Sequence, residues 1–566
     1  MIDFATEKVI ARLLAFGSVC VTVFMISGGV TDPVNAPKFF VLGALGGGSA
    51  LLLLTKGLKS IWRRQRILVY AYILFLISSL NALLQSQAQF SQNLYGSYGR
   101  NNGFIAYLSL SIIFLLAASL QSKGLYSWIA YGFLASGILN VAYCSWVIVF
   151  GDFMGWNNEY NNLLGTFGNP NFIGAFLSIY ATASMAFVVT SKTSLRLRMF
   201  LLVTALVAVI EMLQTNVMQG KVVLGLGAML VLGAVIRSRA TNSLITWVYF
   251  VVFGAVGITA ILGILQKGPL TKYIYQYTVS LRGQYWKAGI ETGREHLFTG
   301  VGFDSLGDWY RRTRSPQALI TPGIDVTTNS AHNVFIDLFA FGGLPLLISY
   351  LVFTGLTFIS IVKKFLATKE FDPIFVSLSV AWIGYQAQSV ISINQLGLAI
   401  WGFLLGGAII GYVHVNAGEK APQNSNRQTR KSKQDTSTIL GPGLIAAIGV
   451  VIGGLISVPP LSADMNMRSA QITRSAEKIE LALQPSYLHP QNTNMYLNSV
   501  ISFEQAGIYE TAVKIAKTAL EFNPNSFETW KALYFLRNST AEDKAKAVKN
   551  MERLDPLNVN VTAPPK

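Results

Sequence analysis

The chain has 566 residues, of which 52% are hydrophobic and only 13% are charged. Ordinary soluble proteins carry about 25% charged residues, and apolar runs near the length needed to cross a bilayer recur along most of this chain. The composition therefore excludes a string of soluble domains and predicts an all-α, polytopic membrane protein.

The net charge of +17 does not indicate a nucleic-acid partner. The last 108 residues, from Pro459 onward, hold 12 basic and 11 acidic residues, which leaves 32 basic and 16 acidic residues for the first 458. Most of this excess occupies short loops between apolar runs, as the charge bias of cytoplasmic loops predicts. Cys20 and Cys144 lie within apolar runs, and they predict neither a disulfide framework nor a metal site.

About thirteen spanning helices are expected along the chain. Their ranges are 9–30, 38–55, 67–84, 104–120, 127–150, 170–190, 199–214, 222–236, 243–265, 333–362, 373–393, 396–415 and 438–458. The first run is long, has no small-residue cleavage site and leads straight into further spans, so a cleaved signal peptide is not expected there.

The basic residues of the short loops predict the orientation. They cluster after the second, sixth, eighth, tenth and twelfth spans: Lys56, Lys59, Arg63, Arg64, Arg66, Lys192, Arg196, Arg198, Arg237, Arg239, Lys363, Lys364, Arg427, Arg430, Lys431 and Lys433. All these loops fall on one side of the membrane, which the charge bias assigns to the cytoplasm. The N-terminus is then cytoplasmic, and an odd number of spans places the C-terminal segment outside.

Four segments are expected. Residues 1–415 form a transmembrane core with a large outer loop at 266–332. Residues 416–437 are polar and basic, which predicts a flexible cytoplasmic linker. Residues 438–458 form the last span, and residues 459–566 form a soluble helical module outside the membrane.

The C-terminal segment contains GIYETAVKIAKTALEFNP, which resembles the second helix of a tetratricopeptide repeat. Ala512 and Ala519 occupy its small-residue positions, and prolines recur at Pro490, Pro524 and Pro556, 34 and 32 residues apart. Two or three degenerate repeats are expected, with an ordinary helical bundle as the alternative. Either structure would be a helical interaction module for a protein partner.

The large loop is strongly basic although it lies on the predicted outer face. Long loops escape the charge bias, so the topology stands, and an anionic ligand is the simplest explanation of the charge. The basic residues are Lys267, Lys272, Arg282, Lys287, Arg294, Arg311, Arg312 and Arg314.

Other outer-face segments place polar residues near helix entries. The segment GSYGRNNG holds Arg100 among glycines and asparagines, and Lys221 follows the short turn VMQGK. The segment GTFGNPNFIG holds Asn169 and Asn171 at a helix start, where local capping is the alternative to substrate binding.

His332 and Asn333 stand where the large loop meets the tenth span. A lone histidine at a helix entry is more often a polar cap than a catalyst. The arginines of the same loop and a Gly-Gly-Leu-Pro sequence about three turns further on favour a catalytic site.

Together these segments resemble the O-antigen ligase family. The resemblance rests on FGNPN, an outer-loop arginine ahead of a tryptophan, GVG before an aromatic-rich stretch, and AHN leading into a glycine-containing helix. It covers roughly residues 10–415 in topology, and its motifs lie mainly in 165–175 and 280–346. The family also includes O-antigen polymerases and bacterial protein O-oligosaccharyltransferases, all similar to C-type glycosyltransferases.

The resemblance implies that His332 is the family histidine. The family pattern is His-(Asn/Ser/Gln), nine residues, then Gly-x-x-(Gly/Pro/Ala). His332-Asn333 and Gly343 have this spacing, whereas Leu346 departs from the last slot.

The family's loop arginine maps onto Arg282, ahead of Trp286. A second family arginine is not matched, because Lys221 stands in the corresponding outer turn. His332 and Arg282 are therefore the expected catalytic residues. The expected substrate-binding residues are Lys221, Arg100, Asn171, Asn333 and Arg294.

Members of the family take a glycan from a polyprenyl-pyrophosphate donor, such as undecaprenyl pyrophosphate, at the outer face of the bacterial cytoplasmic membrane. Arg282 would hold the pyrophosphate by bidentate hydrogen bonds. A neutral His332 would accept the proton of an acceptor hydroxyl on a glycan, lipid or protein. Direct attack would invert the anomeric carbon, and no metal or other cofactor is expected.

The main hypothesis is thus an O-antigen ligase-like transferase, with a polymerase or a protein O-oligosaccharyltransferase of the same family as the alternative. A transporter of lipid-linked substrates would show internal repeats and cationic residues within the spans. A non-catalytic scaffold would tolerate loss of His332 and Arg282.

Overall fold

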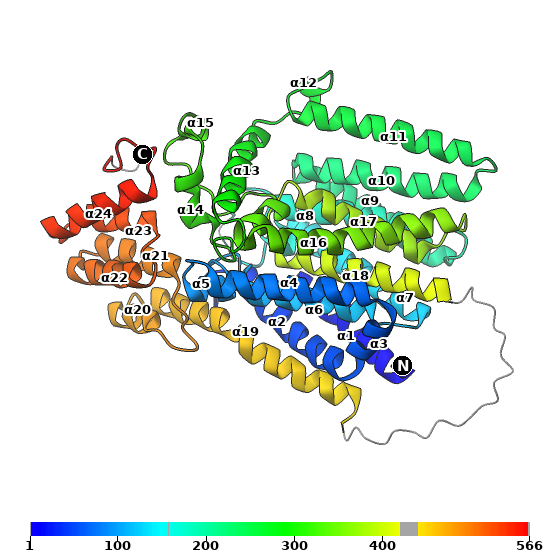
Figure 1. Ribbon diagram of the computed structural model, residues 1–566, viewed down its shortest axis with the longest axis horizontal. Coiled ribbons are helices and arrows are strands. Elements are labelled where there is room, and N and C mark those ends of the chain that lie inside the picture. Colours follow the sequence, from blue (N-terminus) through cyan, green and yellow to red (C-terminus); the bar gives the residue numbers. More distant parts are fainter. Residues whose placement is uncertain (1, 157, 419–439, 564–566) are drawn as a thin grey trace.

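The computed structural model describes residues 2–156, 158–418 and 440–563, and the described chain is all-helical, with no strand. Most of the expected linker and the first two residues of the last expected span lie outside these ranges. Figure 1 shows long helices lying side by side, with the C-terminal helices at one end of the bundle.

Each of the thirteen expected segments overlaps a long helix of the bundle. These helices are α1 (Phe4–Val23), α2 (Asn35–Leu52), α4 (Arg66–Gln85), α6 (Phe104–Ala118), α7 (Tyr126–Phe150), α8 (Pro170–Val188), α9 (Leu195–Gln214), α10 (Met218–Arg239), α11 (Ser243–Ile264), α16 (Val334–Ala367), α17 (Pro373–Ser389), α18 (Leu396–Gly418) and α19 (Pro442–Thr473).

Ten helices in the described chain are long and apolar enough to cross a membrane. The expected count of thirteen is not confirmed. Helices α6 and α17 have only 15 and 17 residues, and α1 carries three charged residues in its first half. The chain is nonetheless a multi-pass membrane protein, and α11 lies at the edge of the bundle, almost wholly exposed (Figure 1).

Glycines hold α19 against α2. A Cβ atom on Gly47 would lie 2.2 Å from the carbonyl oxygen of Gly449, and one on Gly453 would lie 2.2 Å from that of Gly43. Because these residues are glycines, the two backbones pack in direct contact, as small residues allow in membrane helix pairs. Helix α19 is thereby fixed to the bundle.

Helix α19 does not end at residue 458, where the last span was expected to end. It continues through Pro459 and Pro460 to Thr473. Beyond the prolines, the Asp464 carboxylate accepts hydrogen bonds from the backbone of Thr31, at 2.8 Å, and from the Tyr98 hydroxyl. One continuous helix therefore connects the bundle to the C-terminal helices.

The C-terminal module, residues 459–563, has its own hydrophobic core. Ala512 and Ala519 are fully buried in it, as their small size allows. The module forms helical hairpins, but the tetratricopeptide resemblance is not confirmed. Its remaining helices are α20 (Ala476–Leu483), α21 (Thr493–Gln505), α22 (Tyr509–Phe522), α23 (Phe527–Phe535) and α24 (Ala541–Leu554).

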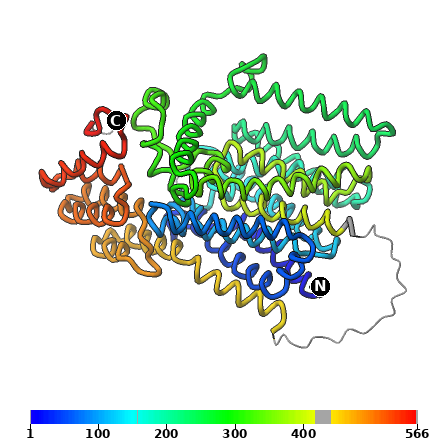
Figure 2. The backbone as a smooth tube through the Cα atoms, in the orientation of Figure 1, coloured from blue at the N-terminus to red at the C-terminus, as the bar shows by residue number. Residues whose placement is uncertain are grey.

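The large loop, residues 265–333, is largely helical and lies at the same end of the bundle as the C-terminal module (Figure 1). We call this the loop end. It also carries α5, and Figure 2 shows the N-terminus far from it. The helices of the loop end are α5 (Phe90–Tyr95), α12 (Thr271–Ile274), α13 (Tyr277–Glu295), α14 (Leu306–Thr313) and α15 (Pro316–Ala318).

A topology prediction follows from the loop charges. Reporters fused after Gly124 and Arg239 should read cytoplasmic, and reporters fused after Pro316 and Asn525 should read extracytoplasmic. Paired reporters active on opposite sides of the membrane measure this. A cytoplasmic reading at Asn525 would contradict the predicted placement of the C-terminal module.

Candidate active site

Helix α16, which begins directly after His332 and Asn333, is kinked near its start. Gly342 and Gly343 leave helical geometry, with Gly343 at φ 67°, as the Gly-Gly-Leu-Pro sequence predicts. Here the backbone N–H of Leu344 donates to the carbonyl of Leu297 at 2.7 Å. A Cβ on Gly343 would lie 2.3 Å from that oxygen, so glycine is needed there. The kink thus holds the segment after α13 against α16.

The entry to α16 fixes the backbone of His332. Asn333 caps the helix, its side chain accepting from the N–H groups of Phe335 and Ile336. The Asp337 carboxylate accepts from the Ser330 hydroxyl at 2.8 Å, and that hydroxyl oxygen accepts from the N–H of His332 at 3.0 Å. His332 has φ 54°, a conformation uncommon outside glycine. Its half-buried ring has no hydrogen-bond partner among the described residues.

The positive charges of two arginines from distant parts of the chain act on His332. Arg100 comes from the loop between α5 and α6, and Arg282 from the second turn of α13. Burial, together with the positive charges of Arg100 and Arg282, lowers the pKa of His332 to about 3. The imidazole is therefore neutral at physiological pH. The Tyr285 ring, one turn after Arg282, lies 5.7 Å from the His332 ring.

Within the described residues, neither arginine has its charge neutralised by a direct partner. Both are half-buried, and burial lowers the pKa of each. The carboxylates of Asp304 and Asp337 oppose this shift for Arg100 from beyond ion-pair distance. Across the described ranges, neither guanidinium forms an ion pair or donates a hydrogen bond. Half-buried guanidinium donors without acceptors are suited to an anionic ligand.

His332 lines a cavity of about 430 Å³ between the large loop and the C-terminal module. The bundle side contributes Gln92, Ser97, Tyr285, Asp304, Gly307, Asp308, Arg311, Thr327, Thr328, Asn329 and His332. The module side contributes Thr493, Asn494, Leu497, Ser526, Phe527 and Glu528. The module therefore forms one wall of the space into which His332 faces.

Ion pairs fasten that wall to the loop. Arg314, which is fully buried, pairs with the buried Asp555 of the module at 2.7 Å, and Arg311 pairs with the same carboxylate at 3.2 Å. Arg311 also pairs with Glu528 at 2.6 Å, and Arg312 donates to Asn525 at 2.7 Å. Three of the loop's eight basic residues thus bind the module. From the sequence, we expected the charge of this loop to bind an anionic ligand.

Removing the shared carboxylate should loosen the module. We expect Asp555→Ala to destabilise it by about 3–5 kcal/mol, because two arginines lose a buried partner. The control is Glu480→Ala, which breaks the exposed pair with Lys514 and should cost about 0–1 kcal/mol. Pulse proteolysis of the purified protein in increasing urea measures both. Equal effects of the two substitutions would contradict the docking role of Asp555.

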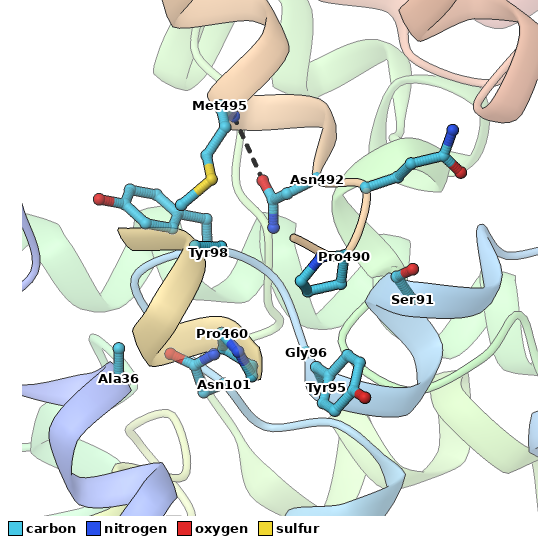
Figure 3. Close-up of a pocket in the computed structure, with 12 residues that line it drawn as sticks. Ala36, Ser91, Tyr95, Gly96, Tyr98, Asn101, Pro460, Pro490, Asn492 and Met495 are labelled. Atoms are coloured by element: carbon cyan, nitrogen blue, oxygen red, sulfur yellow. Dashed lines mark hydrogen bonds between the residues drawn. The ribbon is translucent and has the colours of Figure 1, made fainter. Parts of the chain in front are cut away.

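A smaller pocket lies where the module meets the bundle. Figure 3 shows Tyr95 and Tyr98 from the segment before α6, Pro460 from α19, and Asn492 and Met495 at the start of α21. The Asn492 side chain accepts from the Met495 N–H at 3.3 Å and caps α21. This pocket therefore lies at the junction between the bundle and the start of α21.

Of the predicted site residues, His332 lines the cavity, whereas Arg100, Arg282 and Asn333 are not among its lining residues. The remaining three lie outside the lining as well. Lys221 is exposed in the first turn of α10. Asn171 is half-buried at the start of α8, where Asn169 accepts hydrogen bonds from it and caps the helix. Arg294 is exposed and pairs with Glu291 on the same face of α13 at 3.5 Å.

Sequence reasoning missed several residues around His332. Tyr285 follows Arg282 by three positions, so helical spacing was a usable signal. Asp304 follows the GVG motif and has φ 54°, and its buried carboxylate accepts from the N–H of Ser97 at 2.8 Å. Nothing in the sequence indicated that Asn494 and Glu528 of the module would line the same cavity.

The fold and the site define a multi-pass membrane protein with a cationic, histidine-containing site at one end of its helices. Residues 215–351 match the family described as O-antigen ligase. This match supports the O-antigen ligase family for this part of the chain, and with it a glycosyltransferase-like function in general. The match contains Lys221, Arg282 and His332 but not Arg100. No curated protein matches the chain.

Proposed function

We propose that the protein transfers an oligo- or polysaccharide from a polyprenyl-pyrophosphate carrier to an acceptor hydroxyl, as an O-antigen ligase does. One observation carries the proposal. Arg100 and Arg282 are half-buried, have no direct partner in the described chain, and both act on the electrostatic environment of His332. An anionic group bound by both arginines would lie next to a neutral imidazole.

The chemistry follows from that arrangement. The guanidinium groups of Arg100 and Arg282 hold the pyrophosphate by charge-assisted hydrogen bonds. The acceptor oxygen attacks the anomeric carbon, and the carbon–oxygen bond to pyrophosphate breaks with its electron pair on the leaving group. His332 takes the hydroxyl proton. Bound pyrophosphate offsets the two arginine charges, which raises the pKa of His332 and makes it a better base than in the empty site.

The other predicted residues have smaller roles in the proposal. Lys221 supplies a point charge towards the donor from the first turn of α10, in place of the family arginine. Asn171 and Asn333 act through helix starts that they help to form, and Asn333 fixes His332. Arg294 is exposed and ion-paired, so we leave it out of the pyrophosphate clamp.

We also propose a location for each segment of the chain relative to the membrane. Residues 1–415 form the transferase core in the bacterial cytoplasmic membrane, with the loop end at its outer face. Residues 416–437 are a cytoplasmic linker, and residues 459–566 lie outside. Both substrates then meet where the lipid carrier presents its glycan.

The glycan profile of a deletion strain tests the function. A ligase predicts finished polymer accumulating on the lipid carrier. A polymerase predicts single repeat units on the carrier, and a protein O-oligosaccharyltransferase predicts unglycosylated protein. An unchanged profile of lipid-linked and transferred glycan would contradict all three.

A further inference from the structure

The cavity beside His332 has two walls of different origin. The large loop and the segment before α6 form one, and helices α21 and α23 of the C-terminal module form the other. We propose that the cavity is the acceptor site, that the module forms its second wall, and that the acceptor bound there is a carbohydrate. This inference rests on the proposed function and names the acceptor class for the same site.

The cavity wall has the chemistry of a sugar site. Apart from Gly307, Leu497 and Phe527, every lining residue has a polar side chain. Carboxylates, amides and hydroxyls in this density match the many donors and acceptors of a sugar ring. The alkyl chain of a lipid would leave the lining groups that have no partner in the described chain, among them the amides of Asn329 and Asn494, without a hydrogen bond.

Three lining side chains keep hydrogen-bonding capacity. Asn329 of the large loop and Asn494 of α21 are exposed, and their amides have no partner in the described chain. Glu528 of α23 uses only its Oε1 oxygen to pair with Arg311. These groups come from three different elements around one space, so a ligand in it is contacted from several sides.

The size of the space also favours a sugar. A volume of about 430 Å³ falls in the range of small-molecule pockets, about 300–1,000 Å³. Tyr285 supplies an aromatic face beside His332, on which the apolar face of a sugar ring can lie. The buried ion pairs of Asp555 hold the module wall in place, so the site exists before the acceptor arrives.

Blocking the module wall tests the assignment. In Asn494→Cys, a maleimide-linked polyethylene glycol attached to the exposed thiol would fill the cavity from the module side. The matched control is Asn498→Cys, an exposed asparagine one turn further along α21 that does not line the cavity. The wild-type protein treated with the reagent controls for its half-buried and buried cysteines, Cys20 and Cys144. Leu497→Trp fills the same space without a reagent.

The full-length protein in lipid nanodiscs is given the host strain's lipid-linked glycan and an envelope extract as acceptor. We expect alkylated Asn494→Cys and Leu497→Trp to lose transfer by at least about tenfold. Alkylated Asn498→Cys should stay within about twofold of wild type. Binding of undecaprenyl pyrophosphate, followed by native mass spectrometry, should not change in any of them.

Pretreating the acceptor extract identifies its class. A carbohydrate acceptor survives proteinase K and is destroyed by periodate, which cleaves vicinal diols. Acceptor activity lost to proteinase K, or resistant to both treatments, would overturn the carbohydrate assignment in favour of a protein or a lipid.

Two outcomes separate the inference from the proposed function. Normal transfer by alkylated Asn494→Cys, or loss of undecaprenyl pyrophosphate binding together with transfer, overturns the inference alone. A wild-type protein that neither binds undecaprenyl pyrophosphate nor transfers glycan overturns the proposed function, and the inference falls with it.

Discussion

Replacing His332 with glutamine should reduce glycan transfer by about 10²–10⁴-fold, the usual contribution of a positioned base. Glutamine keeps a hydrogen-bonding side chain but cannot take up a proton. The ring of His332 makes no hydrogen bond within the described chain, so its loss should leave folding and membrane insertion nearly intact. Transfer of labelled glycan from the lipid carrier, normalised to protein in the membrane, measures the effect.

The control for this substitution is His296→Gln, in the same loop. His296 follows α13 and packs edge-on against Trp309, with ring centroids 4.4 Å apart, and it does not line the cavity. Transfer should stay within a few-fold of wild type. If His332→Gln also transfers at a near-normal rate, the histidine orients substrate or supports the helix entry, and it is not the base.

Replacing Arg282 with lysine should be the second most damaging conservative change. Lysine keeps the charge but loses the planar pair of donors. A hydrogen bond to a charged group contributes about 1.5–3 kcal/mol, so we expect a loss of about 10- to 100-fold in transfer. Arg100→Lys should behave similarly, because the charge of Arg100 acts on the same histidine. Both are measured as transfer at limiting donor concentration.

Two matched substitutions accompany this test. Arg294→Lys makes the same change on the exposed face of the same helix and should have little effect. Lys221→Arg restores the residue type that the family carries there and should be tolerated. Identical losses from Arg282→Lys and Arg294→Lys would mean that bidentate binding at Arg282 contributes nothing.

The bundle was predictable because its signal is local. An apolar run of about twenty residues predicts a helix without knowledge of its neighbours, and all thirteen expected segments overlap helices. The end of α19 was not predictable in this way. The last span was expected to end at residue 458, directly before Pro459 and Pro460. Before the prolines, α19 packs against α2, and after them its residue Asp464 accepts hydrogen bonds from Thr31 and Tyr98, so that both contacts depend on residues far away in the chain.

The residues of the candidate site could be proposed from the sequence only where they share a motif. His332 and Arg282 followed from the order and spacing of the family segments, and Arg100 from its place in a glycine- and asparagine-rich turn. The basic charge of the large loop predicted an anionic ligand for Arg311 and Arg314. Both instead pair with Asp555, which lies more than 240 residues further along the chain. For the same reason, no sequence pattern placed the C-terminal module beside the histidine.

Reconstitution of the full-length protein with a polyprenyl-pyrophosphate-linked glycan tests the central claim most directly. The measured quantity is free polyprenyl pyrophosphate released as glycan appears on the acceptor. The proposed mechanism predicts equal amounts of both products from the wild-type protein. It predicts about 10²–10⁴-fold less of both from His332→Gln and about 10- to 100-fold less from Arg282→Lys. Wild-type protein that leaves the lipid-linked glycan intact in the presence of acceptor would contradict it.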